Sequence, residues 1–324
     1  MNSIDNVSFI IIAKNEEFAV EKNIESLSIL NCINCQFIFV DSDSKDNTLK
    51  IIKNFKSVNG NEILILKLKG KLNAAIARNA GFKKVKKDFV FFIDGDTSVE
   101  KKFIEKSIDI FRNDKSVVAI HGILKEIVYS EMTKHILFPK TIRRKYIDSE
   151  FLFGGTVFIR ASSLLLNGTW DEHFVVNEDF EMALRLRRNG DIVMLPETMG
   201  IHHTFEYCDR PWLFFRKGYV AFSGILLRKY LHDFKVVLAL ARKPFMGIIV
   251  GLLFYLMLIL LLISSVFMPK MKVMIWLLLS FMVLDILRAV HKKQSLKNRA
   301  ILRLIYPFGL LYGFVFSNYI EKND

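Results

Sequence analysis

Short apolar runs alternate with amphipathic stretches over the first hundred residues. The runs cover residues 7–13, 37–40, 62–66 and 89–93. Each is four to seven residues long and rich in branched or aromatic side chains, which predicts a strand. The run 89–93 is apolar at every position, so we expect this strand to be buried on both faces. The stretches between them have a helical period and end near Leu30, Phe55 and Val85. Strands that alternate with helices predict right-handed crossovers and a mostly parallel sheet, so we expect an α/β domain.

Polar residues follow these runs at the points where the strands end. They are Lys14, Asn15 and Glu16 after the first run, Asp41 after the second, and Asp94, Gly95 and Asp96 after the fourth. Ligands of open α/β sheets bind at the carboxyl ends of the strands. Two carboxylates separated by glycine can turn toward one divalent cation, and hard oxygen ligands suit Mn²⁺ or Mg²⁺. Such a cation would bind a diphosphate. The alternative is that Asp94 and Asp96 are solvated residues of a polar turn and bind no metal.

The sequence lacks the glycine-rich motifs of two large nucleotide-binding classes. No G-x-G-x-x-G follows the first run, and no G-x-x-x-x-G-K-[ST] occurs anywhere. This argues against a dinucleotide oxidoreductase and a P-loop enzyme. The phosphates of a nucleotide would then depend on a metal ion and on Lys or Arg side chains.

A second acidic pair lies in the segment 168–190. Glu178 and Asp179 are expected to open a helix capped by Asn177, with Glu181 and Arg185 as an i,i+4 pair. The positive end of a helix favours an ionised carboxylate, as a general base requires. Two acids that only complement the helix dipole are the alternative.

Two further features flank this helix. The pair Gly154-Gly155 precedes a probable strand, although it is equally compatible with an ordinary bulge. After the helix we expect a short strand at 191–196, followed by His202 and His203. A neutral imidazole at this place is an acceptable metal ligand, and a buried structural histidine is the alternative.

Composition changes toward the carboxyl end of the chain. Hydrophobic residues make up 52%, mean hydropathy is +0.28, and the formal net charge is +13. The apolar excess lies mostly after Lys243, and basic residues crowd beside it, which favours an anionic membrane surface. No zinc-finger spacing or RNP-like motif is present, so no nucleic-acid partner is expected.

Residues 208–243 combine aromatic side chains with eight Lys or Arg and two acids, which predicts interfacial helices. Three spans are predicted at residues 244–267, 273–290 and 304–320; Pro307 interrupts the last, which could instead be a re-entrant hairpin. The segment 291–303 holds five Lys or Arg and no acid, so it belongs in the cytoplasm by the positive-inside rule. We therefore expect a multi-pass protein of the cell (inner or plasma) membrane with a cytoplasmic amino-terminal domain and no cleaved signal peptide. Cys32, Cys35 and Cys208 match no metal or redox motif and are expected to be reduced thiols.

Four sequence blocks together resemble the family 2 glycosyltransferases. They are IIIAKNEE (10–17), FVDSDSKDNT (39–48), AIARNAG (75–81) and FFIDGDT (91–97). The resemblance extends from about Val7 to His203. It implies a Rossmann-like glycosyltransferase-A domain with a mostly parallel sheet over residues 1–207, followed by interfacial helices (208–243) and a helical transmembrane region (244–324).

The resemblance also implies roles for individual residues. Those implied to bind the donor are Ala13, Lys14, Asn15, Glu16, Asp41, Arg78, Asn79, Asp94, Gly95 and Asp96. Those implied to hold Mn²⁺ or Mg²⁺ are Asp94, Asp96 and His202. Asp179 is the implied base with Glu178 as its orienting neighbour, and Gly154 and Gly155 are implied to lie on the acceptor side.

The implied reaction is inverting, metal-dependent and non-processive transfer from a nucleotide-sugar to a lipid-linked glycan or lipid phosphate in cell-surface glycan synthesis. Asp41 favours a UDP-sugar, because an acid at this place accepts an imide hydrogen bond in uridine enzymes of the family. A processive polysaccharide synthase would need Gln-x-x-Arg-Trp after the base, and this motif is missing. A nucleotidyltransferase would show a glycine-rich loop after the first strand. A non-catalytic membrane scaffold is the remaining alternative, against which the intact acids argue.

Overall fold

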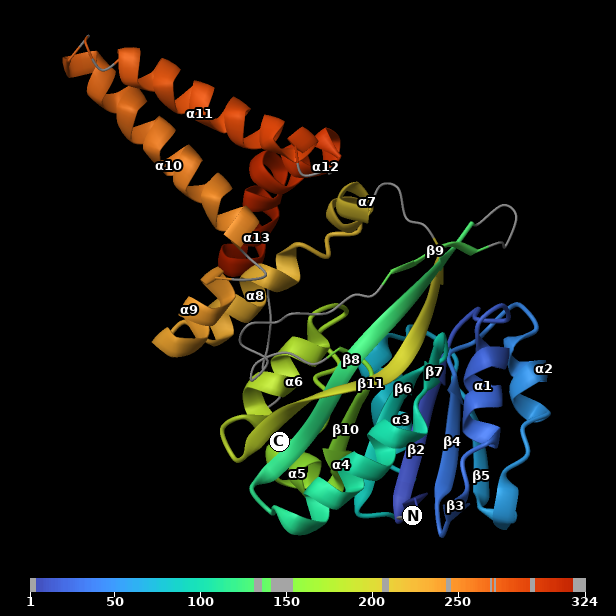
Figure 1. Ribbon diagram of the computed structural model, residues 1–324. Helices are drawn as coiled ribbons and strands as arrows, with labels where there is room; N and C mark the ends of the chain where they lie inside the picture. Colours follow the sequence, from blue (N-terminus) through green and yellow to red (C-terminus); the bar gives the residue numbers. More distant parts are fainter. Residues whose placement is uncertain are drawn as a thin grey trace. The chain divides into compact units, whose positions relative to one another are not determined.

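The structure, a computed structural model, describes residues 4–130, 136–140, 154–205, 210–242, 246–268, 270, 272–291 and 295–316. The chain forms two compact units, residues 1–206 and 207–324. The first is built on a central sheet, and the second is helical through its described elements (Figure 1).

A mixed sheet organises the first unit. Its strands follow the order β5-β4-β2-β6-β10-β8-β11-β7, and β9 pairs with β8. They are β2 (Val7–Ala13), β4 (Gln36–Asp41), β5 (Glu62–Lys67), β6 (Phe89–Asp94), β7 (Thr97–Val99), β8 (Val117–Tyr129), β9 (Ile136–Lys140), β10 (Val157–Arg160) and β11 (Asp191–Phe205). Two short strands, β1 (Ile4–Asp5) and β3 (Cys32–Ile33), form a separate parallel pair.

The four strands predicted from apolar runs are confirmed as β2, β4, β5 and β6. They are parallel neighbours in the order β5-β4-β2-β6, so their carboxyl ends meet at one edge. The sheet becomes mixed after β6, because β10 is antiparallel to both β6 and β8. The fold is therefore an α/β fold in which the mostly parallel half carries the polar edge.

The prediction of a short strand at 191–196 is wrong in its extent. Strand β11 continues through Pro196 to Phe205, and it pairs in parallel with β8. Proline cannot donate to a ladder. The register of β11 shifts between Met194 and Thr198, which leaves Pro196 outside the regular pairing. His202 and His203 consequently lie inside a strand, where successive side chains point to opposite faces.

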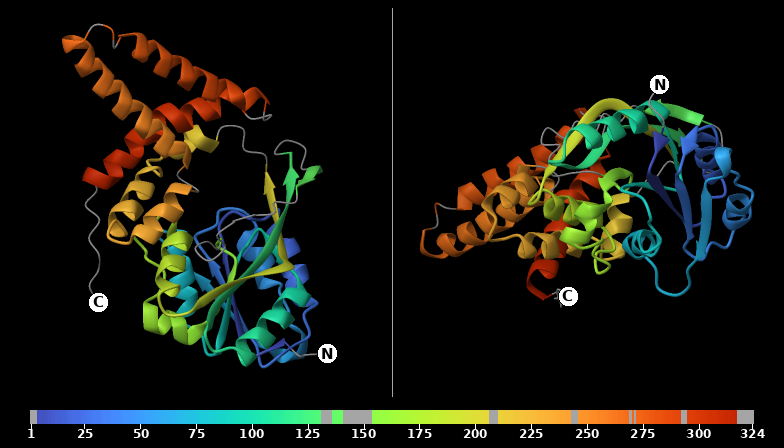
Figure 2. Two further views of the ribbon diagram at one scale, coloured as in Figure 1. Left: turned by 60° about the vertical axis from the view of Figure 1, so that its left-hand side comes forward. Right: turned by 90° about the horizontal axis from the view of Figure 1, so that it is seen from below.

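Helices cover both faces of this sheet (Figures 1 and 2). One apolar core lies under α1 (Val20–Ser28), α2 (Thr48–Lys53) and α4 (Lys101–Asn113). The other lies under α3 (Ala74–Phe82), α5 (Ala161–Asn167) and α6 (Glu178–Leu186). Strand β6 serves both cores, because Phe91 packs into the first and Phe92 into the second. This explains why its sequence is apolar at consecutive positions.

The second unit contains seven α-helices among its described residues. They are α7 (Arg210–Arg216), α8 (Ala221–Lys229), α9 (Phe234–Arg242), α10 (Met246–Phe267), α11 (Lys272–His291), α12 (Leu296–Ala300) and α13 (Tyr306–Phe316). Within the described residues, two helical stretches are long and apolar enough to cross a membrane, Met246–Phe267 and Leu296–Phe316. The predicted span 273–290 lies in α11 but is not one of these two. Residues 317–320 of the third predicted span lie outside the described residues.

A π-helical turn, Ile301–Ile305, joins α12 to α13 directly before Pro307. The hydroxyl of Tyr255 donates to the carbonyl oxygen of Leu304 at 2.9 Å within this turn. Such a turn accommodates the ring of a proline, and the chain therefore stays helical from Leu296 to Phe316. The alternative of a re-entrant hairpin at Pro307 is wrong for the described residues.

Two contacts fix the second unit internally. A side chain at Gly224 of α8 would overlap the carbonyl oxygen of Leu310 in α13, so these helices touch at their backbones. Asp285 of α11 accepts from Arg299 at 2.8 Å and from Arg303 at 2.7 Å. The acid inside the second predicted span is thus paired with two cations from the neighbouring helix.

Candidate active site at the carboxyl edge of the sheet

The loops after β2 and β4 are joined by hydrogen bonds. The N–H of Asn15 donates to Ser44 Oγ at 3.0 Å, and Asn15 Oδ1 accepts from the N–H of Lys45 at 2.8 Å. The N–H of Glu16 donates to Thr48 Oγ1 at 2.7 Å. Asn15 has a φ of 55°, which asparagine adopts more readily than most residues. The amide of Asn15 therefore holds the loop, while Lys14 and Glu16 line the adjoining cavity.

Asp41, the last residue of β4, is wholly buried. Its Oδ2 accepts from the N–H of Ser44 at 3.3 Å, whereas Oδ1 has no donor among the described residues. A buried carboxylate oxygen without a donor costs free energy. A ligand N–H that reached this oxygen would remove that cost.

Strand β6 delivers Asp94 and Asp96 to the same edge. The N–H of Gly95 donates to the carbonyl oxygen of Ile12 at 2.8 Å, and a Cβ at Gly95 would lie 2.8 Å from that of Ala13. Glycine is required here because the end of β2 passes so closely. A cavity of about 250 Å³ opens at this point. Its lining is Ile12, Ala13, Lys14, Glu16, Ser42, Leu72, Asn73, Ala74, Ala77, Asp94, Gly95 and Asp96.

Negative charge accumulates along this cavity. Burial, together with the charges of Asp96 and Asp94, raises the pKa of Glu16 to about 8. His202 Nε2 lies 2.9 Å from Asp96 Oδ2, and its Nδ1 lies 3.4 Å from Glu126 Oε1. Burial alone would lower the pKa of His202, but the hydrogen bond and charge of Asp96 outweigh it and raise that pKa to about 9. The protonated, positively charged form of the His202 ring is therefore favoured beside Asp96.

The predicted metal ligands are only partly assembled. Among the described residues, no three acidic, histidine or cysteine side chains already form a metal-binding group. Asp96 and His202 nevertheless meet directly, and Asp94 lines the same cavity as Asp96. Carboxylate oxygens and an imidazole nitrogen suit Mn²⁺. The residues fit a divalent cation that would replace the proton shared by Asp96 and His202.

His203 points to the other face of β11. Its Nδ1 lies 3.0 Å from the hydroxyl oxygen of Tyr129, and its Nε2 lies 3.1 Å from Ser98 Oγ. Burial, then the charge of Lys22, lowers the pKa of His203 to about 4, so the ring is neutral. Of the two histidines, it is His202 that faces the aspartates.

Arg78 connects the two acidic pairs of the sequence. Its Nη2 donates to Asp94 Oδ1 at 2.8 Å, and its Nη1 donates to Glu178 Oε1 at 2.9 Å. Burial opposes its charge, but Asp94 and Glu178 together raise the pKa of Arg78 above its usual value. The side chain is only 3% exposed and does not line the 250 Å³ cavity. The residue predicted to bind the donor is placed between carboxylates instead.

Helix α6 begins at Glu178, so both predicted catalytic acids lie in its first turn. Asp179 Oδ1 accepts from the N–H of Phe180 at 2.8 Å. The prediction that Asn177 caps this helix through its side chain is wrong: Asn177 has a φ of 65° and makes no such bond. The helix starts after the left-handed backbone turn at Asn177. The side chain of Glu178, its first residue, is held by Arg78.

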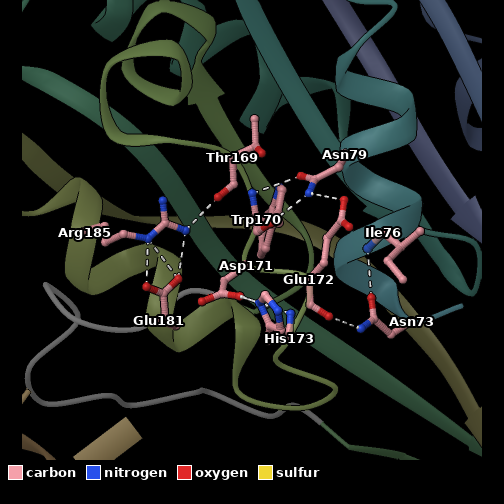
Figure 3. Close-up of polar contacts among 10 residues, drawn as sticks. All are labelled: Asn73, Ile76, Asn79, Thr169, Trp170, Asp171, Glu172, His173, Glu181 and Arg185. Carbon is pink, nitrogen blue, oxygen red and sulfur yellow. Dashed lines mark hydrogen bonds and ion pairs between the residues drawn. The ribbon is translucent and has the colours of Figure 1, made fainter. Parts of the chain in front are cut away.

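The loop before α6 is fixed from two helices (Figure 3). Asn79 Nδ2 donates to the carbonyl oxygen of Trp170 at 2.8 Å, and Asn79 Oδ1 accepts from the N–H of Trp170 at 3.0 Å. Arg185 pairs with Glu181, as predicted, and donates to the carbonyl oxygen of Thr169 at 2.7 Å. Asn79, a predicted donor-binding residue, thus holds this loop and is not part of the cavity lining.

A second, smaller cavity of about 60 Å³ adjoins the first at Asp94. Its lining is Asp94, Thr97, His121, Gly122, Leu124, Gly154, Gly155, Thr156, Met199 and His202. The predicted acceptor-side glycines therefore lie beside the predicted metal ligands. Sequence reasoning missed His121 and Thr156 here, and Asn73 in the larger cavity. Asn73 had a usable signal, because the residue that caps a helix following β5 must lie at the carboxyl edge.

This fold and edge define the glycosyltransferase-A class, and comparisons with known proteins agree. The model of glycosyl transferase family 2 matches residues 8–166, and that of glycosyl transferase family group 2 matches residues 89–316. The chain belongs to this group of family 2 glycosyltransferases.

Curated relatives are distant glycosyltransferases. Poly-beta-1,6-N-acetyl-D-glucosamine synthase of Staphylococcus aureus is 22% identical over 62% of this chain and 52% of its own length. The chain thus spans about half the length of that relative. The amylovoran biosynthesis glycosyltransferase AmsB of Erwinia amylovora is 24% identical over 60% of this chain and 69% of its own length.

Solved structures share the fold. The mannosyltransferase PcManGT of Pyrobaculum calidifontis, in complex with GDP-Man and Mn²⁺, aligns with a TM-score of 0.62 at 13% identity, covering 97% of this chain and 88% of that one. S. aureus TarS in complex with UDP-GlcNAc aligns with a TM-score of 0.53 at 16% identity, covering 68% and 66%.

Proposed function

We propose that this glycosyltransferase moves a sugar from a UDP-sugar to a membrane-associated, lipid-linked acceptor at the cytoplasmic face of the cell membrane. Transfer is inverting, non-processive and dependent on Mn²⁺ or Mg²⁺. The observation that carries the proposal is the meeting of two acidic pairs at one edge of the sheet. Arg78 contacts Asp94 of the first pair and Glu178 of the second, and Asp179 is the next residue of the same helix turn.

The donor half of the site is the 250 Å³ cavity. Asp94, Asp96 and His202 would hold the divalent cation, which when bound neutralises charge on the leaving diphosphate. Asp41 is wholly buried and only its neighbour Ser42 lines the cavity, so the loop after β4 would have to move for Asp41 Oδ1 to accept the imide N–H of uracil. The structural neighbour TarS was crystallised in complex with UDP-GlcNAc, so UDP-GlcNAc is the first donor to test.

The acceptor half is assigned to helix α6 and the small cavity. Asp179 would take the proton of the acceptor hydroxyl, and its position in the first turn of a helix favours the ionised carboxylate. Glu178 would keep this turn in register through Arg78. Gly154 and Gly155 line the small cavity beside Asp94, on the side from which the acceptor would approach.

The membrane assignment is supported by the second unit. The apolar stretch Met246–Phe267 has a mean hydropathy of 3.0, and 17% of its most apolar window is buried within the protein. A helix that is apolar on all sides and unburied needs a lipid environment. Phe234 of α9 is 75% exposed and adjoins basic residues of the predicted interfacial region, a composition typical of a surface helix on anionic lipid.

A processive polysaccharide synthase is the second candidate, because one relative is named for a polymeric product. The test of both is turnover by the full-length protein in lipid nanodiscs with a panel of UDP- and GDP-sugars. Nucleotide release that requires Mn²⁺ and a polyprenyl-linked acceptor, with one sugar added per acceptor, is the expected result. Long products would favour the synthase. Full activity in EDTA, or transfer to water-soluble sugars at the same rate, would contradict the metal or the lipid acceptor respectively.

A further inference from the structure

We infer that Arg78 is a positioning residue, which sets the distance between the donor carboxylate Asp94 and the helix that carries the base. It does not contact the nucleotide-sugar. This inference rests on the proposed function, since it assigns the role of one residue within that site. Three observations carry it: the forked ion pair, the closed packing around the guanidinium, and the balance of charge.

The ion pair uses the two terminal nitrogens of one guanidinium for two different elements. Nη2 holds Asp94 at the end of β6, and Nη1 holds Glu178 at the start of α6, at 2.8 and 2.9 Å. The planar guanidinium fixes the spacing of its two nitrogens. The carboxylates of Asp94 and Glu178 are consequently held at one separation, although they are far apart in sequence.

Among the described residues, the guanidinium is not part of the lining of the donor cavity, and two of its sides are closely packed, although its Nε has no acceptor. Its central carbon lies 4.6 Å from the ring centroid of Trp170, a residue that Asn79 holds by its backbone. On another side, a Cβ at Gly155 would overlap Arg78 and lie 2.5 Å from Asp94 Oδ2. Gly155 is therefore needed for the ion pair to form. With 3% of its side chain exposed, Arg78 cannot reach a nucleotide without breaking both pairs.

The charges explain why this bridge matters for the reaction. Two carboxylates share one cation, so the cluster keeps one net negative charge beside the cavity. Without Arg78, the like charges of Asp94 and Glu178 would repel each other. This repulsion would displace the carboxylate of Asp94 from the cation site and shift the first turn of α6, which contains Asp179.

The experiment uses the full-length protein in nanodiscs and three variants, Arg78→Lys, Glu178→Gln and the double variant. A lysine keeps the charge but cannot fork. Arg185→Lys is the matched control, because Arg185 also holds the loop before α6, through the carbonyl oxygen of Thr169, and forms its ion pair with Glu181. The readouts are Mn²⁺ affinity by electron paramagnetic resonance, UDP affinity without metal, kcat and donor KM.

We expect Arg78→Lys to lower kcat about 10²-fold, the cost typical of a misplacement near 1 Å. Mn²⁺ affinity should fall as well, while metal-free UDP affinity stays within about threefold. The double variant should be no worse than the poorer single variant, because both remove the same bridge. Arg185→Lys should lower the melting temperature and leave Mn²⁺ affinity unchanged.

A different pattern would overturn the inference. Loss of UDP affinity in Arg78→Lys with kcat and Mn²⁺ affinity preserved would make Arg78 a donor contact, and additive losses in the double variant would exclude the bridge. A wild-type protein that binds Mn²⁺ but turns over no donor would contradict the proposed function alone, because the Mn²⁺ titration needs neither donor nor acceptor.

Discussion

Two buried charge clusters, one in each unit, have opposite composition. In the catalytic unit one guanidinium, Arg78, serves two carboxylates; in the helical unit one carboxylate, Asp285, serves Arg299 and Arg303. The first cluster leaves a negative excess and the second a positive one.

Exposure separates them further. Asp94 is 37% exposed although its partner Arg78 is 3% exposed, whereas the members of the Asp285 cluster are 10% to 13% exposed. A carboxylate that is partly exposed can accept a further ligand while it keeps its buried partner, whereas the mostly buried Asp285 is already shared by two arginines. The comparison suggests that chemistry belongs to the first cluster and architecture to the second.

Replacing the aspartate of each cluster by asparagine tests this comparison most directly, and the larger effect is expected at Asp94. Asp94→Asn removes the negative excess at the cavity, and charge on the leaving group would go unneutralised. Loss of several kcal/mol of transition-state stabilisation corresponds to a fall in turnover of about 10³-fold or more. Nucleotide release by purified protein is the measurement, with Asp96→Ala and EDTA as parallel cases. Retained turnover in Asp94→Asn would remove the metal assignment.

The base is tested one residue away from the first cluster. Asp179→Asn keeps the shape of the side chain and removes its capacity to accept a proton, so kcat should fall about 10²–10⁴-fold. Donor affinity should stay nearly unchanged, as measured by UDP-sugar titration. If Glu178→Gln is the more damaging change, the roles of the two acids are reversed.

Asp285→Asn tests the second cluster. It leaves Arg299 and Arg303 without their carboxylate, and removing one partner of a buried pair typically costs about 3–5 kcal/mol. The melting temperature in detergent should fall, while kcat per folded molecule and Mn²⁺ affinity stay at wild-type values. A large loss of kcat with an unchanged melting temperature would give the Asp285 cluster a direct part in the reaction.

The smallest expected effect is a dependence of stability on pH that comes from His203, the histidine that faces away from the aspartates. The pKa of His203 is lowered from 6.5 to about 4, so its neutral ring contributes stability above pH 6.5 that is lost as the pH falls toward 4. Thermal melts between pH 7 and pH 4 should show a decline that is shallower in His203→Gln. Parallel declines in both proteins would mean that His203 does not titrate in this range.

The sequence predicted the parallel half of the sheet because β2, β4 and β6 are buried on both faces and read as apolar runs. Strand β5 lies at the edge of the sheet and is only partly buried, but it still contains a short apolar run. It could not predict the antiparallel insertion of β10, which depends on pairing between strands distant in the chain. It also underestimated β11, because Pro196 is usually a strand breaker and the register shift that tolerates it is a tertiary feature.

The sequence predicted which residues form the candidate site better than it predicted how they contact one another. Asp96 and His202 meet directly and Asp94 lines the same cavity as Asp96, but the three do not form a metal-binding group in the described residues. The contacts of Arg78 and Asn79 were not predictable, since an Arg-Asn pair on a helix gives no sign of which face it presents. Their partners, Glu178 and Trp170, lie about a hundred residues later in the chain.

The alternation of His202 and His203 in β11 has a consequence for how this sequence can diverge. Because neighbouring strand positions face opposite sides, deletion of one residue between Gly200 and His202 would move His203 into the place of His202 and turn His202 to the other face. The ring that now lies beside Tyr129 would then meet Asp96. The irregular register between Met194 and Gly200 can absorb a change of length before this point. Homologous chains should therefore vary in length before Gly200 and keep a constant count of residues from there to the histidine that faces the aspartates.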